Sequence, residues 1–297
     1  MIVKSVIELI GDTPLVRLGH EQIFAKAEFL NPGGSIKDRI ALNMIQAAEI
    51  DGRLRPGMTI VEPTSGNTGI GITMVGKSRG YNVIIVMPEG MSEERKNLIR
   101  VLGGELVLTP DSESVNGAVK KALELQKKYD AFMPNQFGNP ANPACHYHFT
   151  GPEIWRQSYG EIDAFVSGIG SGGTIQGIGK YLKEQNPKIR VIAVEPKNVS
   201  ALLGHEPGLH QIQGIGDGFI PEVLDVSLID EIIEVSDEQA IDTTRDLAKK
   251  YSLLVGTSSG ANVFGAREFI RKNPEMRVAT ILADRAERYF STGLLTL

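Results

Sequence analysis

The sequence predicts an α/β protein with two lobes, each built on a parallel sheet flanked by helices. Runs of β-branched apolar residues alternate with helical patterns, which is typical of parallel strands joined by crossover helices. A stretch rich in Pro and Asn, residues 133–144, separates two such series. The length of 297 residues suits two domains of ordinary size or one large α/β domain.

The first series begins with a helix, expected at 36–50 ("IKDRIALNMIQAAEI"). Its strands are expected at 59–63, 82–88 and 105–110, and the helices that follow them at 67–80, 92–103 and 115–129.

The second series lies beyond residue 144. Its strands are expected at 163–169, 190–196, 253–257 and 277–284, with helices from Thr174, near 237–251 and from Ala261. Ligands of open α/β sheets bind at the carboxyl ends of the strands, so a cleft between the two lobes is the expected site.

The composition of the chain argues against several classes of binding partner and against a membrane location. The net charge is −5 and no Lys/Arg run stands out, so neither nucleic acid nor an anionic membrane is expected as a partner. No apolar stretch approaches the roughly 20 residues that span a bilayer, and the N-terminus lacks the features of a signal peptide. The single cysteine, Cys145, fits a reducing compartment, and we expect a cytoplasmic protein. His146 and His148 lie beside Cys145 without the i, i+4 spacing of a helical zinc motif, so no metal site is expected.

The stretch "NPGGSIKDR" (31–39) places a lysine at the start of the first helix. Ser35 is a suitable N-cap, and Asp38 three residues later makes a weak capping box. Lys37 shares a helix face with four apolar residues, Ile40, Ala41, Met44 and Ala48. Two interpretations stay open: Lys37 extends into solvent from the first turn, or desolvation keeps its amine easy to deprotonate and ready to form a Schiff base.

A glycine-rich turn follows the strand expected at 163–169. Gly168, Gly170 and Gly173 match the G-x-G-x-x-G pattern, and Glu195 ends the next strand, as in dinucleotide-binding enzymes that use NAD. The same turn, Gly170 to Thr174, could instead hold a single phosphate through its backbone N–H groups and the helix N-terminus. The pattern does not distinguish these two ligands.

Two further strand-to-helix turns carry small hydroxyl and amide side chains. The turn "EPTSGNTGIG" holds Thr64, Ser65, Asn67 and Thr68, which suits a bound carboxylate, although a helix cap needs only one of them. The turn "LLVGTSSGANVF" offers Ser258 and Ser259, for which helix capping is the simpler explanation.

Together these motifs resemble the cysteine synthase family, two-lobed fold type II enzymes (tryptophan synthase β-like) that use pyridoxal 5′-phosphate. The matching stretches, in order along nearly the whole chain, include "IGDTPLVRL", "NPGGSIKDR", "VEPTSGNTGIG", "NQFGNPANP", "TGPEIW", "GIGSGGT", "IQGIGDGFIP", "VGTSSGA" and "DRAERYFSTG". The resemblance implies a homodimer. It also implies a smaller, mobile lobe at 31–140 and a larger lobe, residues 1–30 plus 141–297, that binds the cofactor phosphate.

The resemblance assigns roles to single residues. Lys37 corresponds to the Schiff-base lysine, Asn67 to the residue bonded to the ring hydroxyl, and Ser258 to the residue facing the pyridine nitrogen. The cofactor phosphate corresponds to the turn Gly170, Ser171, Gly172, Gly173 and Thr174, which displaces the NAD interpretation. The pocket for the substrate carboxylate corresponds to Thr64, Ser65, Thr68 and Gln136.

The implied reaction is β-replacement through an α-aminoacrylate: O-acetylserine loses acetate, sulfide adds, and cysteine forms. A hydroxyl at the ring nitrogen leaves that nitrogen largely unprotonated, which favours loss of a β-leaving group over transamination. Lys37 would take the α-proton as general base.

Two positions depart from the family. Asp217 stands where a small residue is usual; it is either a turn residue facing water or, if it points inward, a base that activates water. Arg285 follows Asp284 where many cysteine synthases have Ser, and an arginine there occurs in the branch that also accepts thiosulfate. The alternatives are therefore a cysteine hydroxyl-lyase, which makes serine and sulfide from cysteine and water, and a catalytically idle binding partner, for instance of serine acetyltransferase.

Overall fold

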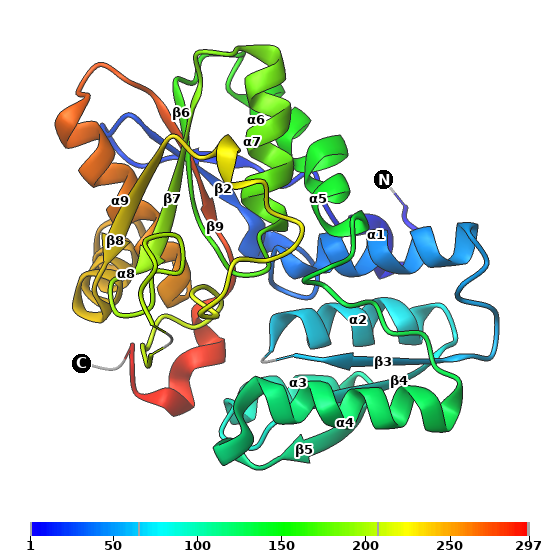
Figure 1. Ribbon diagram of the computed structural model, residues 1–297. Coiled ribbons are helices and arrows are strands. Elements are labelled where there is room, and N and C mark those ends of the chain that lie inside the picture. Colours follow the sequence, from blue (N-terminus) through cyan, green and yellow to red (C-terminus); the bar gives the residue numbers. More distant parts are fainter. Residues whose placement is uncertain (1, 65, 207, 296–297) are drawn as a thin grey trace.

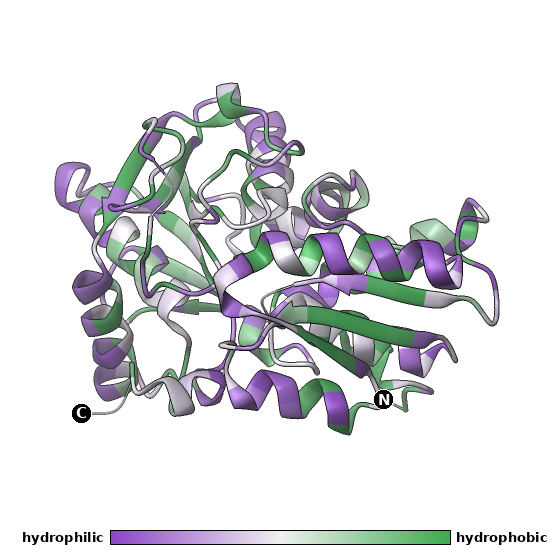
Figure 2. Cartoon of the chain, turned by 60° about the horizontal axis from the view of Figure 1, so that its bottom comes forward, coloured by the Kyte–Doolittle hydropathy of each residue, from purple (hydrophilic) through white to green (hydrophobic). Residues whose placement is uncertain are grey.

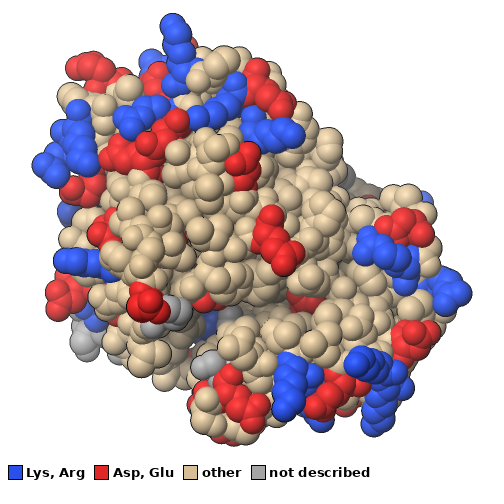
Figure 3. All heavy atoms as spheres, viewed as in Figure 1, with Lys and Arg blue, Asp and Glu red and all other residues tan. Residues whose placement is uncertain are grey.

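The computed structural model describes residues 2–64, 66–206 and 208–295, and it contains two separate sheets (Figure 1). The large sheet has the strand order β1-β2-β9-β6-β7-β8 and the small sheet the order β3-β4-β5. In Figure 1 the small sheet lies at the lower right, beneath α1 and α2, and Figure 3 shows the surface hollowed between the two halves of the molecule. The lobe boundaries expected around 31–140 stay a prediction. No helix in the described part of the chain is long and apolar enough to cross a membrane.

The small sheet is covered on both faces. It consists of β3 (Thr59–Pro63), β4 (Asn82–Pro88) and β5 (Glu105–Thr109), with α1 (Lys37–Ile50), α2 (Asn67–Ser78), α3 (Glu93–Val101) and α4 (Ser114–Tyr129). Val83, Ile85 and Met87 of β4 belong to the core beneath α1 and α2, whereas Ile84 and Val86 face α4. Because successive side chains of a strand point to opposite faces, a strand covered on both sides is apolar throughout.

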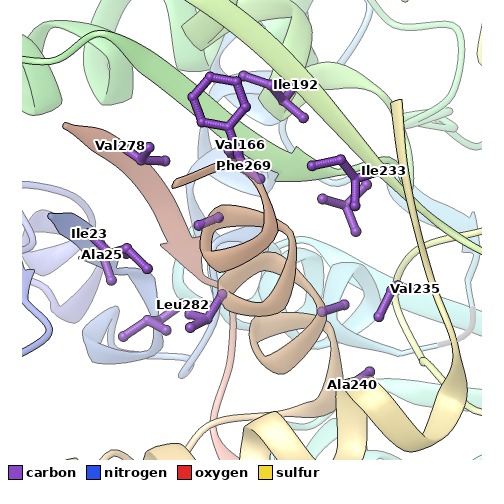
Figure 4. Packing of buried hydrophobic residues seen from close by; sticks show 14 of the residues in the cluster. Ile23, Ala25, Val166, Ile192, Ile233, Val235, Ala240, Phe269, Val278 and Leu282 are labelled. Atoms are coloured by element: carbon purple, nitrogen blue, oxygen red, sulfur yellow. The ribbon is translucent and has the colours of Figure 1, made fainter. Parts of the chain in front are cut away.

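The large sheet is also covered on both faces. Its strands are β1 (Leu15–Arg17), β2 (Ile23–Ala27), β6 (Ala164–Gly168), β7 (Arg190–Pro196), β8 (Glu231–Val235) and β9 (Val278–Leu282). Its helices are α5 (Ala141–Cys145), α6 (Gly151–Gln157), α7 (Gly173–Gln185), α8 (Asp237–Tyr251) and α9 (Thr257–Lys272). Figure 4 shows Val166, Ile192 and Phe269 in the core around α9, and Phe165 and Val191 belong to the core on the α6 and α7 side.

Short helical turns complete the chain: η1 (Val6–Leu9), η2 (Glu28–Leu30), η3 (Asp111–Glu113), η5 (Val226–Leu228) and η6 (Ala286–Thr292) are 3-10 turns, and η4 (His146–Thr150) is a π-helical turn. Among the described strands, only β1 and β2 pair antiparallel. Figure 2 shows the strands largely green and the polar, purple residues concentrated on the helices. The predicted alternation of parallel strands and helices is confirmed.

The strand predicted at 253–257 is wrong, and the helix expected from Ala261 begins at Thr257. Val255 forms only an isolated bridge with Arg285. The nearby strand β9 lies between β2 and β6 and has no free edge with which this segment could pair, so the chain runs directly into α9. Strands β1, β2 and β8 were not among the predicted strands. At the start of α1 the Ser35 hydroxyl accepts a hydrogen bond from the Lys37 N–H at 3.2 Å.

A buried cluster of four charged side chains fixes the start of α1. Arg39 Nε lies 2.6 Å from Glu28 Oε2, and Arg39 Nη2 lies 2.6 Å from Glu153 Oε2. Lys26 Nζ lies 2.6 Å from the same Glu153 oxygen. Desolvation raises the pKa of Glu153, but hydrogen bonds and charges from Arg39 and Lys26 outweigh it and lower that pKa to about 2. Two cations and two anions balance one another and lock α1 to η2 and α6.

Arg39→Met is expected to lower the free energy of unfolding by about 3–5 kcal/mol, because it leaves the carboxylates of Glu28 and Glu153 buried without their main cation. Arg156→Met is the matched control: the Arg156 side chain is 68% exposed in its ion pair with Asp12, and exposed pairs contribute about 0–1 kcal/mol. Urea unfolding followed by circular dichroism measures both. Equal losses in the two variants would mean that the cluster does not hold α1.

Candidate active site

Lys37, the first residue of α1, has a half-buried side chain. Its Nζ atom makes no hydrogen bond or ion pair with any residue that the structure describes. Desolvation lowers the pKa of Lys37, while the charges of Asp217 and Asp284 oppose this shift. A lowered pKa brings the amine closer to its neutral, nucleophilic form at neutral pH.

Lys37 lines two adjoining cavities, which we call the large cavity (about 280 Å³) and the small cavity (about 50 Å³). Five residues line both: Lys37, Asn67, Ser171, Gly214 and Ile215. Pockets for small molecules commonly measure about 300–1,000 Å³, so the large cavity approaches the size of a small-molecule site.

The turn from Gly170 to Thr174 leads from β6 into α7 and forms one wall of the small cavity. A Cβ at Gly170 would lie 2.4 Å from the carbonyl oxygen of Gly214, and a Cβ at Gly173 would lie 1.9 Å from Asn142 Oδ1. With no side chain in the way, the backbone N–H groups and the N-terminus of α7 can approach a phosphate directly. The described residues that line the small cavity include no Asp or Glu, which also favours an anionic ligand.

This turn also contacts His146, for which the sequence pattern indicated no role. Nε2 of the buried imidazole lies 3.3 Å from Thr174 Oγ1, and Nδ1 lies 3.0 Å from Thr150 Oγ1. Burial holds the pKa of His146 well below its usual range, so the ring is neutral. Burial likewise raises the pKa of the Cys145 thiol to about 12. Across residues 2–64, 66–206 and 208–295, no three His, Cys, Asp or Glu side chains are grouped to hold a metal ion.

Asn67 begins α2 and borders both cavities. Its Nδ2 donates to Asp284 Oδ2 at 2.6 Å, and its Oδ1 accepts from Arg288. The Tyr289 hydroxyl donates to the same Asp284 oxygen at 2.7 Å. These contacts with the C-terminal segment fix the Asn67 amide and leave its second N–H for a ligand. Nothing in the sequence pattern around Asp284 indicated this role.

The residues predicted to bind the substrate carboxylate lie together in the wall of the large cavity. Thr68 Oγ1 donates to Gln136 Oε1 at 2.7 Å, and Thr64 Oγ1 accepts from the Gly66 N–H at 3.1 Å. Thr64, Thr68 and Gln136 all line this cavity. Ser65, predicted for the same pocket, lies outside the described residues. The arrangement offers neutral donors to an anionic group.

Glu62, which the sequence analysis did not single out, holds the Gln136 segment in place. Its carboxylate is 1% exposed and accepts the backbone N–H groups of Asn135 at 2.9 Å and Gln136 at 3.2 Å. Desolvation, partly offset by these hydrogen bonds, raises the pKa of Glu62 to about 7.

At the start of α9, Ser258 lines the small cavity, while Ser259 accepts a hydrogen bond from the Ala283 N–H at 2.8 Å. Asn262, one turn further on, accepts from the Gly168 N–H at 2.6 Å and donates to the Ile281 carbonyl at 2.8 Å. Of the two serines, Ser258 therefore faces the cavity and Ser259 ties α9 to β9. Asn262 is a further wall residue that sequence reasoning missed.

Asp217 lines the large cavity from a loop in which Gly216 has a φ of +74° and Gly218 a φ of +79°. Such left-handed conformations favour glycine, and they turn the loop sharply on either side of Asp217. Desolvation raises the pKa of Asp217, while the charge of Lys37 lowers it. The residue as a whole is exposed at the cavity wall.

Two residues singled out in the sequence lie elsewhere. Arg285 lines neither cavity, and its Nε donates to the Phe29 carbonyl at 3.0 Å. Glu195 accepts hydrogen bonds from Ser200 Oγ at 2.7 Å and the Leu202 N–H at 3.1 Å. Glu195 is thus bound to the loop that follows β7 and lines neither cavity, so it is not placed to bind a ribose.

Gly170→Ala is expected to weaken retention of the pyridoxal phosphate that the resemblance implies by about 10- to 100-fold, because the new Cβ forces the turn and the Gly214 backbone apart. The measurement is cofactor absorbance per mole of chain after dialysis. Gly80→Ala is the control: it adds a Cβ at a φ of +81° with nothing within 4 Å. Equal cofactor content in both variants would contradict the close approach proposed for the phosphate.

Comparison with known proteins identifies the family of this chain. Residues 6–284 match the family described as "Pyridoxal-phosphate dependent enzyme". The chain is 48% identical to cysteine synthase from Staphylococcus aureus strain Mu50 over 303 residues, 98% of this chain and 97% of the relative. It is 43% identical to the crystal structure of O-ureido-L-serine synthase, with a TM-score of 0.95, over 99% of this chain and 95% of that chain.

A hydrogen sulfide-producing enzyme from Fusobacterium nucleatum is 40% identical, with a TM-score of 0.94, over 97% of this chain and 100% of that chain. These full-length structural matches confirm the predicted fold type II architecture. The chain belongs to the pyridoxal-phosphate-dependent enzyme family, as a homologue of the cysteine synthases.

Proposed function

We propose that this protein catalyses β-replacement on a small amino acid, as a cysteine synthase that converts O-acetyl-L-serine and sulfide to L-cysteine and acetate. The observation that carries the proposal is the half-buried amine of Lys37, which has no partner among the described residues and shares a cavity wall with Thr68 and Gln136. The identity to the cysteine synthase of Staphylococcus aureus supports this choice of reaction.

The walls of the small cavity fit pyridoxal phosphate. Lys37 would hold the cofactor covalently, and the turn from Gly170 to Thr174 would hold its phosphate through backbone N–H groups at the start of α7. The glycines let this turn pack directly against Gly214 and Asn142. Asn67 would face the ring hydroxyl and Ser258 the ring nitrogen. When bound, the cofactor supplies an electron sink for the substrate Cα–H bond, and a hydroxyl partner at the ring nitrogen keeps that sink weak.

The chain's own residues then position the substrate and move its proton. Hydrogen bonds from the Thr64 hydroxyl and the Gln136 amide to the substrate carboxylate would aim the Cα–H bond at Lys37, which makes proton transfer effectively intramolecular. Thr68, which donates to Gln136 Oε1, would hold that amide in place. The Lys37 amine takes the proton from Cα and later returns it to the same carbon. Its lowered pKa helps, because a neutral amine can accept a proton at neutral pH. The Cβ–O bond breaks with its electron pair leaving on acetate, and hydrosulfide forms the Cβ–S bond.

Lys37→Ala is expected to lower turnover by about 10⁴-fold or more, because it removes both the covalent anchor and the base. Borohydride reduction of the wild-type enzyme followed by peptide mass spectrometry should place the cofactor on Lys37. Lys77→Ala, at an exposed position of α2, is the control and should keep both the label and the activity. A label on another lysine of the wild-type enzyme would overturn the assignment.

A second candidate reaction uses water in place of sulfide, and the position of Asp217 in the large-cavity wall favours it. Its carboxylate would repel hydrosulfide by roughly 4 kcal/mol at about 4 Å and an effective dielectric near 20, whereas water pays no such penalty. Acting as general base toward water, it would give a cysteine hydroxyl-lyase: the Cβ–S bond of L-cysteine breaks, a Cβ–O bond forms, and L-serine and hydrogen sulfide are released. The similarity to a hydrogen sulfide-producing enzyme supports this candidate.

Asp217→Asn separates the two reactions, since it keeps the shape and removes the charge and the base. Serine formation from cysteine is expected to fall by about 10²- to 10⁴-fold, while cysteine formation from O-acetylserine and sulfide stays at least at the wild-type rate. Glu222→Gln, an exposed acid in the same region, is the control. Amino acid analysis of the products of both reactions measures the serine and the cysteine that each variant forms. If the wild-type enzyme makes no serine, the cysteine synthase assignment stands alone.

We also propose, from the resemblance, a cytoplasmic homodimer with a mobile lobe at 31–140. Serine acetyltransferase is the protein partner that the resemblance implies for this enzyme. An idle binding protein, the remaining alternative, is disfavoured. Such a protein would have no need to keep Lys37, Asn67, Gln136 and Ser258 together around two cavities.

A further inference from the structure

Asn142, the second residue of α5, lies between the proposed phosphate turn and the segment that carries Gln136. Its side chain is fully buried and lines neither cavity. Its Nδ2 atom donates to the Gln136 carbonyl at 2.8 Å and to Ser171 Oγ at 3.0 Å. An amide nitrogen has two N–H groups, so both hydrogen bonds form at once. One atom therefore connects a segment in the wall of the large cavity to a turn in the wall of the small cavity.

The amide of Asn142 is packed tightly against the phosphate turn. Its Oδ1 atom occupies the space that a side chain at Gly173 would fill, since a Cβ there would lie only 1.9 Å away. Among the described residues, this buried oxygen has no hydrogen-bond partner. A buried acceptor without a partner costs free energy, and such costs are found mainly at functional sites. The two donor contacts of Nδ2 are therefore what holds the amide in place.

The peptide group of Gln136 is held on both sides. Its N–H donates to Glu62 Oε1 at 3.2 Å, and its carbonyl accepts from Asn142. The side-chain oxygen of Gln136 accepts from Thr68 Oγ1 at 2.7 Å. These contacts set the direction of the remaining Gln136 N–H groups, which are proposed to bind the substrate carboxylate. A binding group must be held to within about 0.5 Å to keep its geometry, so the loss of one of these contacts weakens it.

The other end of the connection is the Ser171 hydroxyl. Because its oxygen accepts from Asn142, its own proton is left to donate to another group. Ser171 lines the small cavity together with the glycines of the same turn. A phosphate bound there would accept this proton and fix the hydroxyl. The fixed hydroxyl would in turn fix the Asn142 amide that holds the Gln136 carbonyl.

We propose that Asn142 is a positioning residue that couples the two sites, so that phosphate bound at the turn raises the affinity for an amino acid carboxylate at Gln136. The inference rests on the proposed function, because it takes pyridoxal phosphate as the source of the phosphate and an amino acid as the second ligand. The strength of this coupling is that of one or two neutral hydrogen bonds, about 3- to 10-fold in a dissociation constant.

The test measures the dissociation constant of L-alanine from the change in cofactor absorbance during a titration. L-Alanine has the carboxylate but no β-leaving group, so binding is measured without turnover. Ser171→Ala removes the acceptor at the phosphate end, and Asn142→Ala removes both hydrogen bonds. Each variant is expected to raise the dissociation constant about 3- to 10-fold.

The double variant decides whether the effect of Ser171 passes through Asn142. It is expected to match Asn142→Ala within about twofold, because without the amide the Ser171 hydroxyl is no longer connected to Gln136. If Ser171→Ala leaves the dissociation constant unchanged, or if the two factors multiply in the double variant, the proposal is overturned. Should Asn142→Ala not fold, Asn142→Ser, which retains at most one of the two hydrogen bonds, takes its place in the cycle.

Two further variants distinguish coupling from a general loosening of α5. Ser171→Thr keeps the hydroxyl that accepts from Asn142 and should bind L-alanine as tightly as the wild type. Asn43→Ala is the matched control: Asn43 Nδ2 donates to the Ala141 carbonyl at 2.6 Å, so it anchors the same helix without contacting the phosphate turn. It should leave the dissociation constant unchanged within about twofold. A rise as large as that of Asn142→Ala would overturn the role of Asn142.

Cofactor content and cysteine formation from O-acetylserine and sulfide, measured in parallel on the wild type, separate this inference from the proposed function. A wild-type enzyme that retains cofactor and makes cysteine, but whose two variants act independently, overturns the role of Asn142 alone. A wild-type enzyme that retains no cofactor, or makes neither cysteine nor serine, overturns the proposed function as well.

Discussion

The position of Lys37 depends on the buried ion cluster two residues further along α1. Arg39 meets Glu28 and Glu153, which belong to the half of the molecule built on the large sheet. The rest of α1 packs its apolar face, including Met44, in the core of the other half. One helix is therefore held by charges at its start and by apolar contacts along its length. Because the first turn is pinned, its lysine can stay in the cavity wall without a partner of its own.

Three helices, α2, α7 and α9, begin at the cavities, with Asn67, the Gly170–Thr174 turn and Ser258 at or beside their first turns. Helix N-termini carry partial positive charge and unpaired N–H groups. Neutral groups can therefore bind the anionic parts of a cofactor and a substrate. The cavity walls then require few charged side chains for this binding. Arg95, a buried cation in the wall of the large cavity, is an exception.

The part of this architecture that depends on local sequence could be predicted. The apolar run of β4 and the glycines of the Gly170–Thr174 turn can each be recognised from a few consecutive residues. Glu62 could not be recognised, because its role depends on backbone groups more than seventy positions away. The segment at 253–257 was misjudged for a similar reason: its apolar residues suit a strand, but only the order of the sheet reveals that β9 has no free edge. Contacts between distant segments decide such cases.

The π-helical turn η4 joins α5 to α6 and holds one more residue than a regular turn. His146 at its start contacts Thr174 beside the proposed phosphate site, and Glu153 beyond it belongs to the ion cluster beneath Lys37. One residue corresponds to about 100° of rotation around a helix axis. The extra residue therefore changes the angular offset between the two side chains. With it, one short helical segment contacts both the ion cluster at the start of α1 and the turn of the proposed phosphate site.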